Sequence, residues 1–221
     1  GKQTSPKAWE ALTPEQRARA VYEFTYDSVK SMLDAGVDVR VVQVGNETNS
    51  GNIAGAKGWA ESTPIFKAGA DAVRALAADT GRDLKVAVHF TNPEVPANLT
   101  GAAKQLDAAG VDYDIFASSY YPFWHGSLEN LTSVLSEVAT TYDKDVIVAE
   151  TAWNFTDEDG DGQPNTVPTN TPADEAYPSS VQGQADAIRA VVQAVADVAD
   201  SRGAGVFYWE PAWVPVGPPE A

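Results

Sequence analysis

The sequence contains no cysteine, and positively charged residues are few. Without cysteine, the chain forms no disulfides, thiolate metal sites or cysteine nucleophiles. Its 15 Lys and Arg face 31 Asp and Glu, so the formal charge is −16 at pH 7. Because phosphate binding requires clustered positive charge, this balance argues against nucleic acids and anionic membrane surfaces as partners. No apolar run reaches the roughly 20 residues that span a bilayer, so we expect no membrane insertion.

Helical and strand patterns alternate along the chain. Thr13 is a helix N-cap, Pro14 follows at the first helical position, and Gln16 completes a capping box in a helix that stops at Gly36. Further helices are predicted to start at Thr63 and to cover residues 97–109, 127–142 and 181–202. Short, valine-rich strands are predicted at residues 39–44, 84–90, 115–119, 145–150 and 205–208. Buried strands of this kind are typical of parallel sheets that are covered by helices.

Two α/β folds fit this alternation, a doubly wound sheet and a (β/α)8 TIM barrel. Polar and aromatic residues follow every predicted strand, and in a barrel all these strand ends share one rim. The chain contains no glycine-rich phosphate loop of the kind that doubly wound folds usually carry. These features favour the barrel.

Five strands do not close an eight-stranded barrel. We therefore expect residues 1–221 to form a single catalytic (β/α)8 barrel domain of which only the C-terminal five βα units, strands 4–8, are present. About three units would then be missing upstream. The segment 157–179 is rich in Pro, Thr and Asp and is interpreted as a long functional loop.

Glu47 and Glu150 are the strongest catalytic candidates. Each ends a buried apolar strand, where an unpaired carboxylate is costly unless a site uses it. In a barrel they would face each other across the mouth, as retaining glycoside hydrolysis requires. The alternative is that either glutamate is simply ion-paired at a strand end. The adjacent Asn46 and the surrounding aromatic residues favour the catalytic interpretation.

Aromatic residues follow the same strands. Flat, stiff rings suit the C–H faces of sugars, although some of these rings could simply pack the barrel rim. The candidates are Tyr120, Tyr121, Phe123, Trp124, Trp153, Trp209 and Trp213.

The segment 157–165 offers oxygen ligands at alternating positions around glycines, which is the chemistry that Ca²⁺ prefers. A solvated acidic loop is the alternative. His89 and His125 have no metal-ligand spacing and are candidate hydrogen-bonding groups at the rim, although His89 could equally be a hydrogen-bonded core histidine. A Ser–His–Asp triad is a weak option because the chain has no GxSxG motif.

Several motifs together resemble one family. VQVGNETN, HFTNP, SSYYPFWHG, VIVAETAW, DEDGDG and GVFYWEPAW occur in this order and resemble the arabinogalactan endo-β-1,4-galactanases, glycoside hydrolase family 53 of clan A. The resemblance covers essentially the whole chain and implies a (β/α)8 barrel. It also independently points to a missing N-terminal portion.

The resemblance implies that Glu47 is the acid/base and Glu150 the nucleophile in retaining hydrolysis of internal β-1,4 linkages of galactan or arabinogalactan. It implies that Asn46 contacts the sugar 2-hydroxyl. Further residues are implied to contact sugar or a structural Ca²⁺ ion. The sugar contacts are Tyr120, Trp124 and Trp209, and the Ca²⁺ ligands are Asp159, Asp161, Gln163 and Asn165.

We therefore expect a monomeric, secreted or cell-surface enzyme that acts on galactan polysaccharides and oligosaccharides. Two other hypotheses remain open. The chain could be another clan A β-glycanase, such as a mannanase, or a non-catalytic galactan-binding fragment.

Overall fold

The computed structural model describes residues 5–158, 167 and 171–210. Its centre is one parallel sheet of five strands in the order β1-β2-β3-β4-β5. The strands are β1 (Val41–Val44), β2 (Lys85–Phe90), β3 (Ile115–Ser119), β4 (Asp145–Thr151) and β5 (Gly203–Tyr208). A doubly wound sheet reverses its strand order, whereas a barrel adds each strand beside the last. The strand order therefore confirms part of a (β/α)8 barrel.

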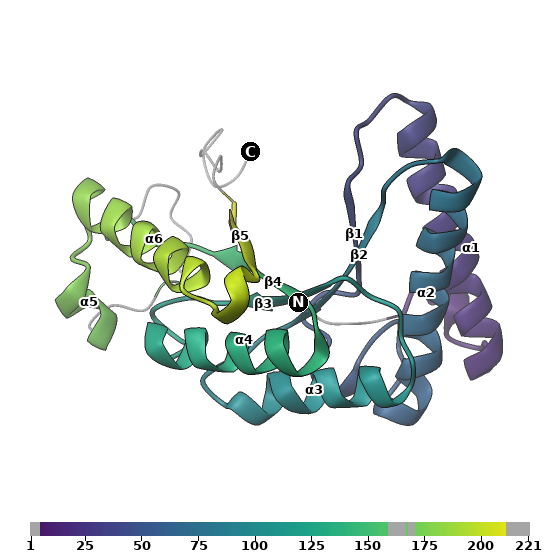
Figure 1. Cartoon of the computed structure of the whole chain (residues 1–221), viewed down its shortest axis with the longest axis horizontal. Helices are drawn as coiled ribbons and strands as arrows, with labels where there is room; N and C mark the ends of the chain where they lie inside the picture. The colour runs from purple at the N-terminus through teal and green to yellow at the C-terminus, as the bar shows by residue number, and fades with distance from the viewer. Residues whose placement is uncertain (1–4, 159–166, 168–170, 211–221) are drawn as a thin grey trace.

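Helices connect the strands and follow one another along one side of the sheet (Figure 1). They are α1 (Pro14–Asp34), α2 (Trp59–Thr80), α3 (Pro96–Ala108), α4 (Leu128–Tyr142), α5 (Pro172–Ala176) and α6 (Val181–Ala196). Short 3-10 turns cover Lys7–Trp9, Asn49–Gly51 and Ala199–Ser201. Within the described residues, we find no helix with the length and hydropathy of a membrane span.

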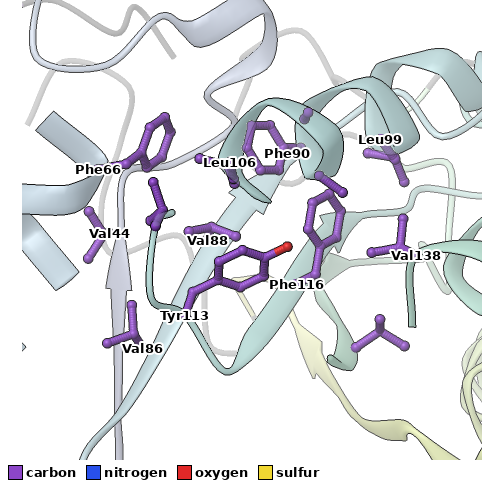
Figure 2. Packing of buried hydrophobic residues seen from close by; sticks show 14 of the residues in the cluster. Val44, Phe66, Val86, Val88, Phe90, Leu99, Leu106, Tyr113, Phe116 and Val138 are labelled. Atoms are coloured by element: carbon purple, nitrogen blue, oxygen red, sulfur yellow. The ribbon is translucent and has the colours of Figure 1, made fainter. Parts of the chain in front are cut away.

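Alternate side chains of each strand point to opposite faces of the sheet. One face packs on the helices and forms the main core, which Figure 2 shows around Val88, Phe90 and Phe116. The other face carries a smaller cluster of Ala87, Ile115, Ala117 and Ile147. With both faces buried, the central strands have the apolar sequences that predicted them.

The predicted start of α1 is confirmed. Thr13 accepts a hydrogen bond from the Gln16 backbone N–H, and the Gln16 side chain accepts one from the Thr13 backbone N–H. Of the periodic apolar residues of this helix, Val21, Val29 and Leu33 are buried. Phe24 is exposed and meets only the edge of the Trp9 ring among the ring contacts described.

The predicted start of the second helix at Thr63 is wrong. The helix begins at Trp59, whose ring packs against Phe66 and Phe90 with centroid distances of 6.4 and 6.1 Å. The Thr63 hydroxyl donates to the Trp59 carbonyl instead of capping a helix start. Tertiary packing of one aromatic ring thus extends the helix beyond its local start signal.

The last long helix and the predicted long loop also differ from the prediction, and most strand bounds move by one or two residues. The helix predicted at residues 181–202 ends at Ala196, because Val198 takes an extended ψ of 137° and a separate 3-10 turn precedes β5. The segment predicted as a loop contains the five-residue helix α5. Such a short helix has too few turns for a periodic apolar pattern.

Gly69 sets the distance between α2 and β1. A Cβ atom at this position would lie 2.6 Å from a Val44 methyl carbon, which is closer than real carbon contacts allow. The absence of a side chain lets the helix approach the strand directly before the turn that carries Asn46 and Glu47.

Val138 on α4 is fully buried, whereas Val181 on α6 is 74% exposed. Val138→Ala removes buried methyl groups and leaves a cavity, so we expect it to lower the free energy of unfolding by about 2 kcal/mol. Val181→Ala, the same change on an exposed helix position, should alter it by less than about 0.5 kcal/mol. Urea unfolding measures both, and equal effects would contradict the core described here.

Candidate active site

The carboxyl ends of the strands bring polar side chains from distant parts of the chain together. Glu47 follows β1, His89 lies in β2, and Glu150 lies near the end of β4. A carboxylate oxygen of each glutamate and a ring nitrogen of His89 all lie within 4.8 Å of one another. The convergence expected for Glu47 and Glu150 is therefore found, although 103 positions separate them in the sequence.

The turn after β1 presents Glu47 in an uncommon backbone conformation. Gly45 has φ of +83° and Glu47 has φ of +48°, a region that L-residues rarely adopt. Hydrogen bonds to the end of β2 hold the turn: the Thr48 backbone N–H and hydroxyl both donate to the His89 carbonyl, at 3.0 and 2.9 Å. Non-glycine residues keep such conformations where the surroundings over-determine them, often at functional sites.

Glu150 is a buried carboxylate with one close hydroxyl partner. Its residue is only 7% exposed, and the Tyr121 hydroxyl donates to Glu150 Oε2 at 2.9 Å. Burial raises the pKa of Glu150, and the nearby charge of Glu47 adds to this effect. Hydrogen bonds from Tyr121 and Asn46 oppose it because they favour the ionised form. The polar contacts therefore act to keep a buried group charged.

Glu47 contacts a different set of side chains. Its Oε1 atom lies 2.7 Å from Ser119 Oγ, and Ser119 Oγ lies 2.9 Å from His89 Nε2. The other ring nitrogen of His89 is 3.0 Å from Asn46 Oδ1. Burial lowers the pKa of His89 to about 4, against a smaller raising effect of the Glu47 charge. His89 is therefore neutral near pH 7, and the two carboxyl groups differ in environment.

Two carboxyl groups at this separation match the retaining class of glycoside hydrolases. Retaining enzymes hold their carboxyl groups about 5–5.5 Å apart, whereas inverting enzymes leave about 6.5–9.5 Å for a water molecule. Different environments also suit a division into proton donor and nucleophile. The geometry can therefore support a double displacement at a sugar carbon.

Aromatic rings surround a cavity beside Glu150. The cavity has a volume of about 480 Å³, and Tyr121, Trp124, Trp153 and Trp209 are among its lining residues. Trp124 and Trp209 are 50% and 47% exposed, so their ring faces are accessible to a ligand. A second cavity of about 250 Å³ lies between Glu47 and Trp124. Trp124 therefore borders both openings.

Not all predicted aromatic contacts are equally accessible. Tyr120 is 1% exposed, and its hydroxyl donates to the Gly126 carbonyl at 2.7 Å. Trp153 is also 1% exposed. The Trp153 ring lines the larger cavity, whereas Tyr120 packs in the main core, and a sugar contact for Tyr120 stays a prediction. Trp213 and the four implied calcium ligands lie outside the described residues.

The sequence predicts Tyr121 only as one of several aromatic residues at the rim, and it does not single out Ser119. The signal was present in the alternation of side chains along β3, which places Ser119 and Tyr121 on one face and Tyr120 on the other. Applied to the end of this strand, that period predicts that Ser119 and Tyr121 point toward the carboxylates.

One protein family matches nearly the whole chain. The model of glycosyl hydrolase family 53 matches residues 1–220. Over 217 residues the chain is 52% identical to the endo-beta-1,4-galactanase of Bacillus subtilis (strain 168), covering 98% of this chain and 49% of that protein. It is 34% identical over 223 residues to the arabinogalactan endo-beta-1,4-galactanase of Cellvibrio japonicus (strain Ueda107), covering 96% and 57%.

A solved structure is similar over the same region. The GH53 catalytic domain of Ignisphaera aggregans matches with a TM-score of 0.87 and 32% identity, covering 97% of this chain and 59% of that domain. The chain thus spans about half the length of the curated relatives that it matches.

Glu150→Gln removes the buried charge and keeps the side-chain shape. Because the pKa of Glu150 is raised in the folded protein, the stability that this carboxyl contributes is complete below its ordinary pKa of 4.5 and is lost as the pH rises through the raised value. We expect Glu150→Gln to be more stable than the wild type at pH 7 and equally stable near pH 4. Urea unfolding at both pH values measures this.

Glu137 on α4 provides the control for this comparison, since it is exposed and Glu137→Gln makes the same chemical change. We expect little change in stability at either pH. A Glu150→Gln variant that is less stable than the wild type at pH 7 would show that the buried charge does not lower the free energy of unfolding.

Proposed function

The chain belongs to glycosyl hydrolase family 53, and we propose that the complete protein hydrolyses internal β-1,4-galactosidic bonds of galactan or arabinogalactan with retention of anomeric configuration. The observation that carries this proposal is the approach of Glu47 and Glu150 within 4.8 Å at the strand ends. The galactanases that resemble the chain support the choice of substrate.

In the first step, Glu47 donates its proton to the glycosidic oxygen while a Glu150 oxygen attacks the anomeric carbon. The bond to the leaving sugar breaks with its electron pair, and a covalent glycosyl-enzyme forms. The hydrogen bonds that Glu150 receives from Tyr121 and Asn46 favour the ionised form of the nucleophile before attack.

In the second step, Glu47 acts as the base. It removes a proton from water, the water oxygen attacks the anomeric carbon, and Glu150 leaves as a carboxylate. While the intermediate lasts, Glu150 carries no charge, so a carboxylate at Glu47 meets less repulsion. Each of the two steps inverts the configuration of the anomeric carbon, so the product has net retention.

The accessible faces of Trp124 and Trp209 would bind galactose rings on either side of the scissile bond, next to the openings of about 480 and 250 Å³. Asn46 is exposed at the same rim, within reach of a sugar hydroxyl. A polymer of this kind is too large to enter a cell, which supports secretion or display at the cell surface.

Structural Ca²⁺ is part of the proposal. Asp159, Asp161, Gln163 and Asn165 offer only oxygen ligands, as Ca²⁺ prefers, and they follow the strand that carries Glu150. An ion bound there would tether the segment between β4 and α5 beside the aromatic cavity.

Glu47→Gln and Glu150→Gln each remove one carboxyl group that the reaction requires. We expect each variant of the complete protein to lose at least about 10³-fold in kcat/KM on galactan while still binding galactan in an affinity assay. The control Glu137→Gln should keep wild-type activity. Proton NMR of the first product should show the β-anomer.

Parallel assays on mannan and xylan test whether galactan is the preferred substrate. Faster cleavage of either would favour another β-glycanase activity over a galactanase. Galactan binding without release of reducing sugar by the complete protein would instead favour a non-catalytic function.

Removal of Ca²⁺ tests whether a bound ion stabilises the folded protein. We expect a chelator to lower the thermal midpoint of the complete protein, and added Ca²⁺ to restore it, because the ion binds only the folded state. Asp161→Ala should abolish this dependence, whereas Asp27→Ala, at an exposed position of α1, should keep it. A midpoint that is insensitive to chelator would contradict the ion's structural role.

A further inference from the structure

A chain of hydrogen bonds connects a backbone carbonyl to Glu47, and we call it the relay. The relay begins at the Gly45 carbonyl oxygen and ends at a Glu47 carboxyl oxygen. The successive distances are Gly45 O–Gln43 Nε2 2.9 Å, Gln43 Nε2–Asn46 Oδ1 3.1 Å, Asn46 Oδ1–His89 Nδ1 3.0 Å, His89 Nε2–Ser119 Oγ 2.9 Å and Ser119 Oγ–Glu47 Oε1 2.7 Å.

The carbonyl at the first end determines the direction of every bond up to the imidazole. A carbonyl oxygen only accepts, so the Gln43 amide turns its NH₂ group toward Gly45 and donates its second hydrogen to Asn46 Oδ1. Because Asn46 Oδ1 also only accepts, His89 Nδ1 must carry a hydrogen. This orientation leaves the Asn46 NH₂ group for the hydrogen bond with Glu150.

The remaining bonds then depend on how many protons the relay holds. In neutral His89 with a hydrogen on Nδ1, Nε2 has a lone pair and accepts the hydrogen of the Ser119 hydroxyl. Ser119 has no second hydrogen for Glu47. The 2.7 Å contact between them is a hydrogen bond in this arrangement only if the Glu47 carboxyl is protonated and donates to Ser119 Oγ.

If Glu47 is ionised while His89 is neutral, one bond of the relay is lost. Ser119 can turn its hydroxyl toward the carboxylate, but His89 Nε2 then has no donor. His89 and Ser119 are both fully buried, so water does not easily replace it. With His89 neutral, the relay is therefore fully satisfied only when Glu47 carries the proton.

We propose that His89, acting through the Ser119 hydroxyl, is a positioning residue that holds Glu47 in the protonated form needed for the first step of hydrolysis. The proposal rests on the proposed function for the role of that proton. When Glu47 gives its proton to the leaving sugar, Ser119 turns from His89 to the new carboxylate. The same hydroxyl thus serves both forms of Glu47.

Other charged or titratable groups also face Glu47. Glu150 lies across the site, with a carboxylate oxygen within 4.8 Å of a Glu47 oxygen. Tyr121 and His125 come from the segment after β3, and burial lowers the pKa of His125 and raises that of Tyr121. All three groups stay unchanged in the variants whose pH profiles are compared below, so a difference between those profiles reports on His89 and Ser119.

Nitrogen NMR of the histidine rings tests the relay directly. His125 Nδ1 accepts from the Tyr121 backbone N–H at 3.0 Å, so neutral His125 carries its hydrogen on Nε2. We expect the opposite tautomers at pH 7, with the hydrogen on Nδ1 in His89 and on Nε2 in His125. Signals of the ¹⁵N-labelled full-length protein are assigned by their loss in His89→Phe and His125→Phe.

A His89 ring that is protonated on Nε2, or on both nitrogens, would overturn the proposal. This measurement needs no activity. It decides on the relay even if the variants below fold poorly, and also if the protein does not cleave galactan, in which case only the proposed function fails.

The pH dependence of kcat/KM on galactan tests whether His89, through Ser119, holds the proton on Glu47. His89→Phe removes the acceptor that competes for the Ser119 hydrogen, so an ionised Glu47 no longer leaves a buried group unpaired. We expect the alkaline limb of the profile to move to lower pH by about half to one unit.

A double-mutant cycle separates this coupling from general disturbance of the site. In the Ser119→Ala background, His89→Phe should cause no further shift of the alkaline limb, because the connecting hydroxyl is gone. In the control background Ser118→Ala, where the buried hydroxyl next in sequence contacts the Ser119 carbonyl, the full shift should remain. An equal shift in both backgrounds would overturn the proposal.

Discussion

Repulsion between two carboxyl groups held within 4.8 Å is the constraint around which this site is organised. The repulsion would be relieved if the groups moved apart, but the turn after β1 and the end of β4 fix their positions. Instead, each group has its own partners. Donors from Tyr121 and Asn46 favour charge on Glu150, while Ser119 and neutral His89 leave Glu47 best satisfied as an acid.

This organisation depends on parallel strands in sequential order. The two glutamates and the residues around them come from four neighbouring strands or the turns that directly follow them, so small differences in register would separate them. The pairing of β3 with β4 contains an irregularity between Ser118 and Ser119, which pairs Ser119 with Glu150. Such irregularities redirect side chains next to active sites. Here the irregularity lies where Ser119, which contacts Glu47, pairs with Glu150.

The sequence predicts most of the scaffold because buried parallel strands and capped helices have strong local patterns. The strand at residues 115–119 and the capping box of Thr13 are found as predicted. The start of α2 is not, since it depends on the packing of Trp59 against Phe90, which lies in another element, β2. The two glutamates were identifiable as strand-end carboxylates. Their different surroundings were not, because they arise from Ser119, His89 and Tyr121, whose contacts appear only once the strands are paired.

Gly69 connects the outer layer of the barrel to the reacting groups. It lies on α2 against Val44, and the turn that presents Glu47 begins at the next residue, Gly45. A side chain at this helix position would require Val44 or the helix to shift, because its Cβ atom alone would lie 2.6 Å from a Val44 methyl carbon. The contact of a helix backbone with one strand therefore limits where the Glu47 carboxylate can lie relative to Glu150.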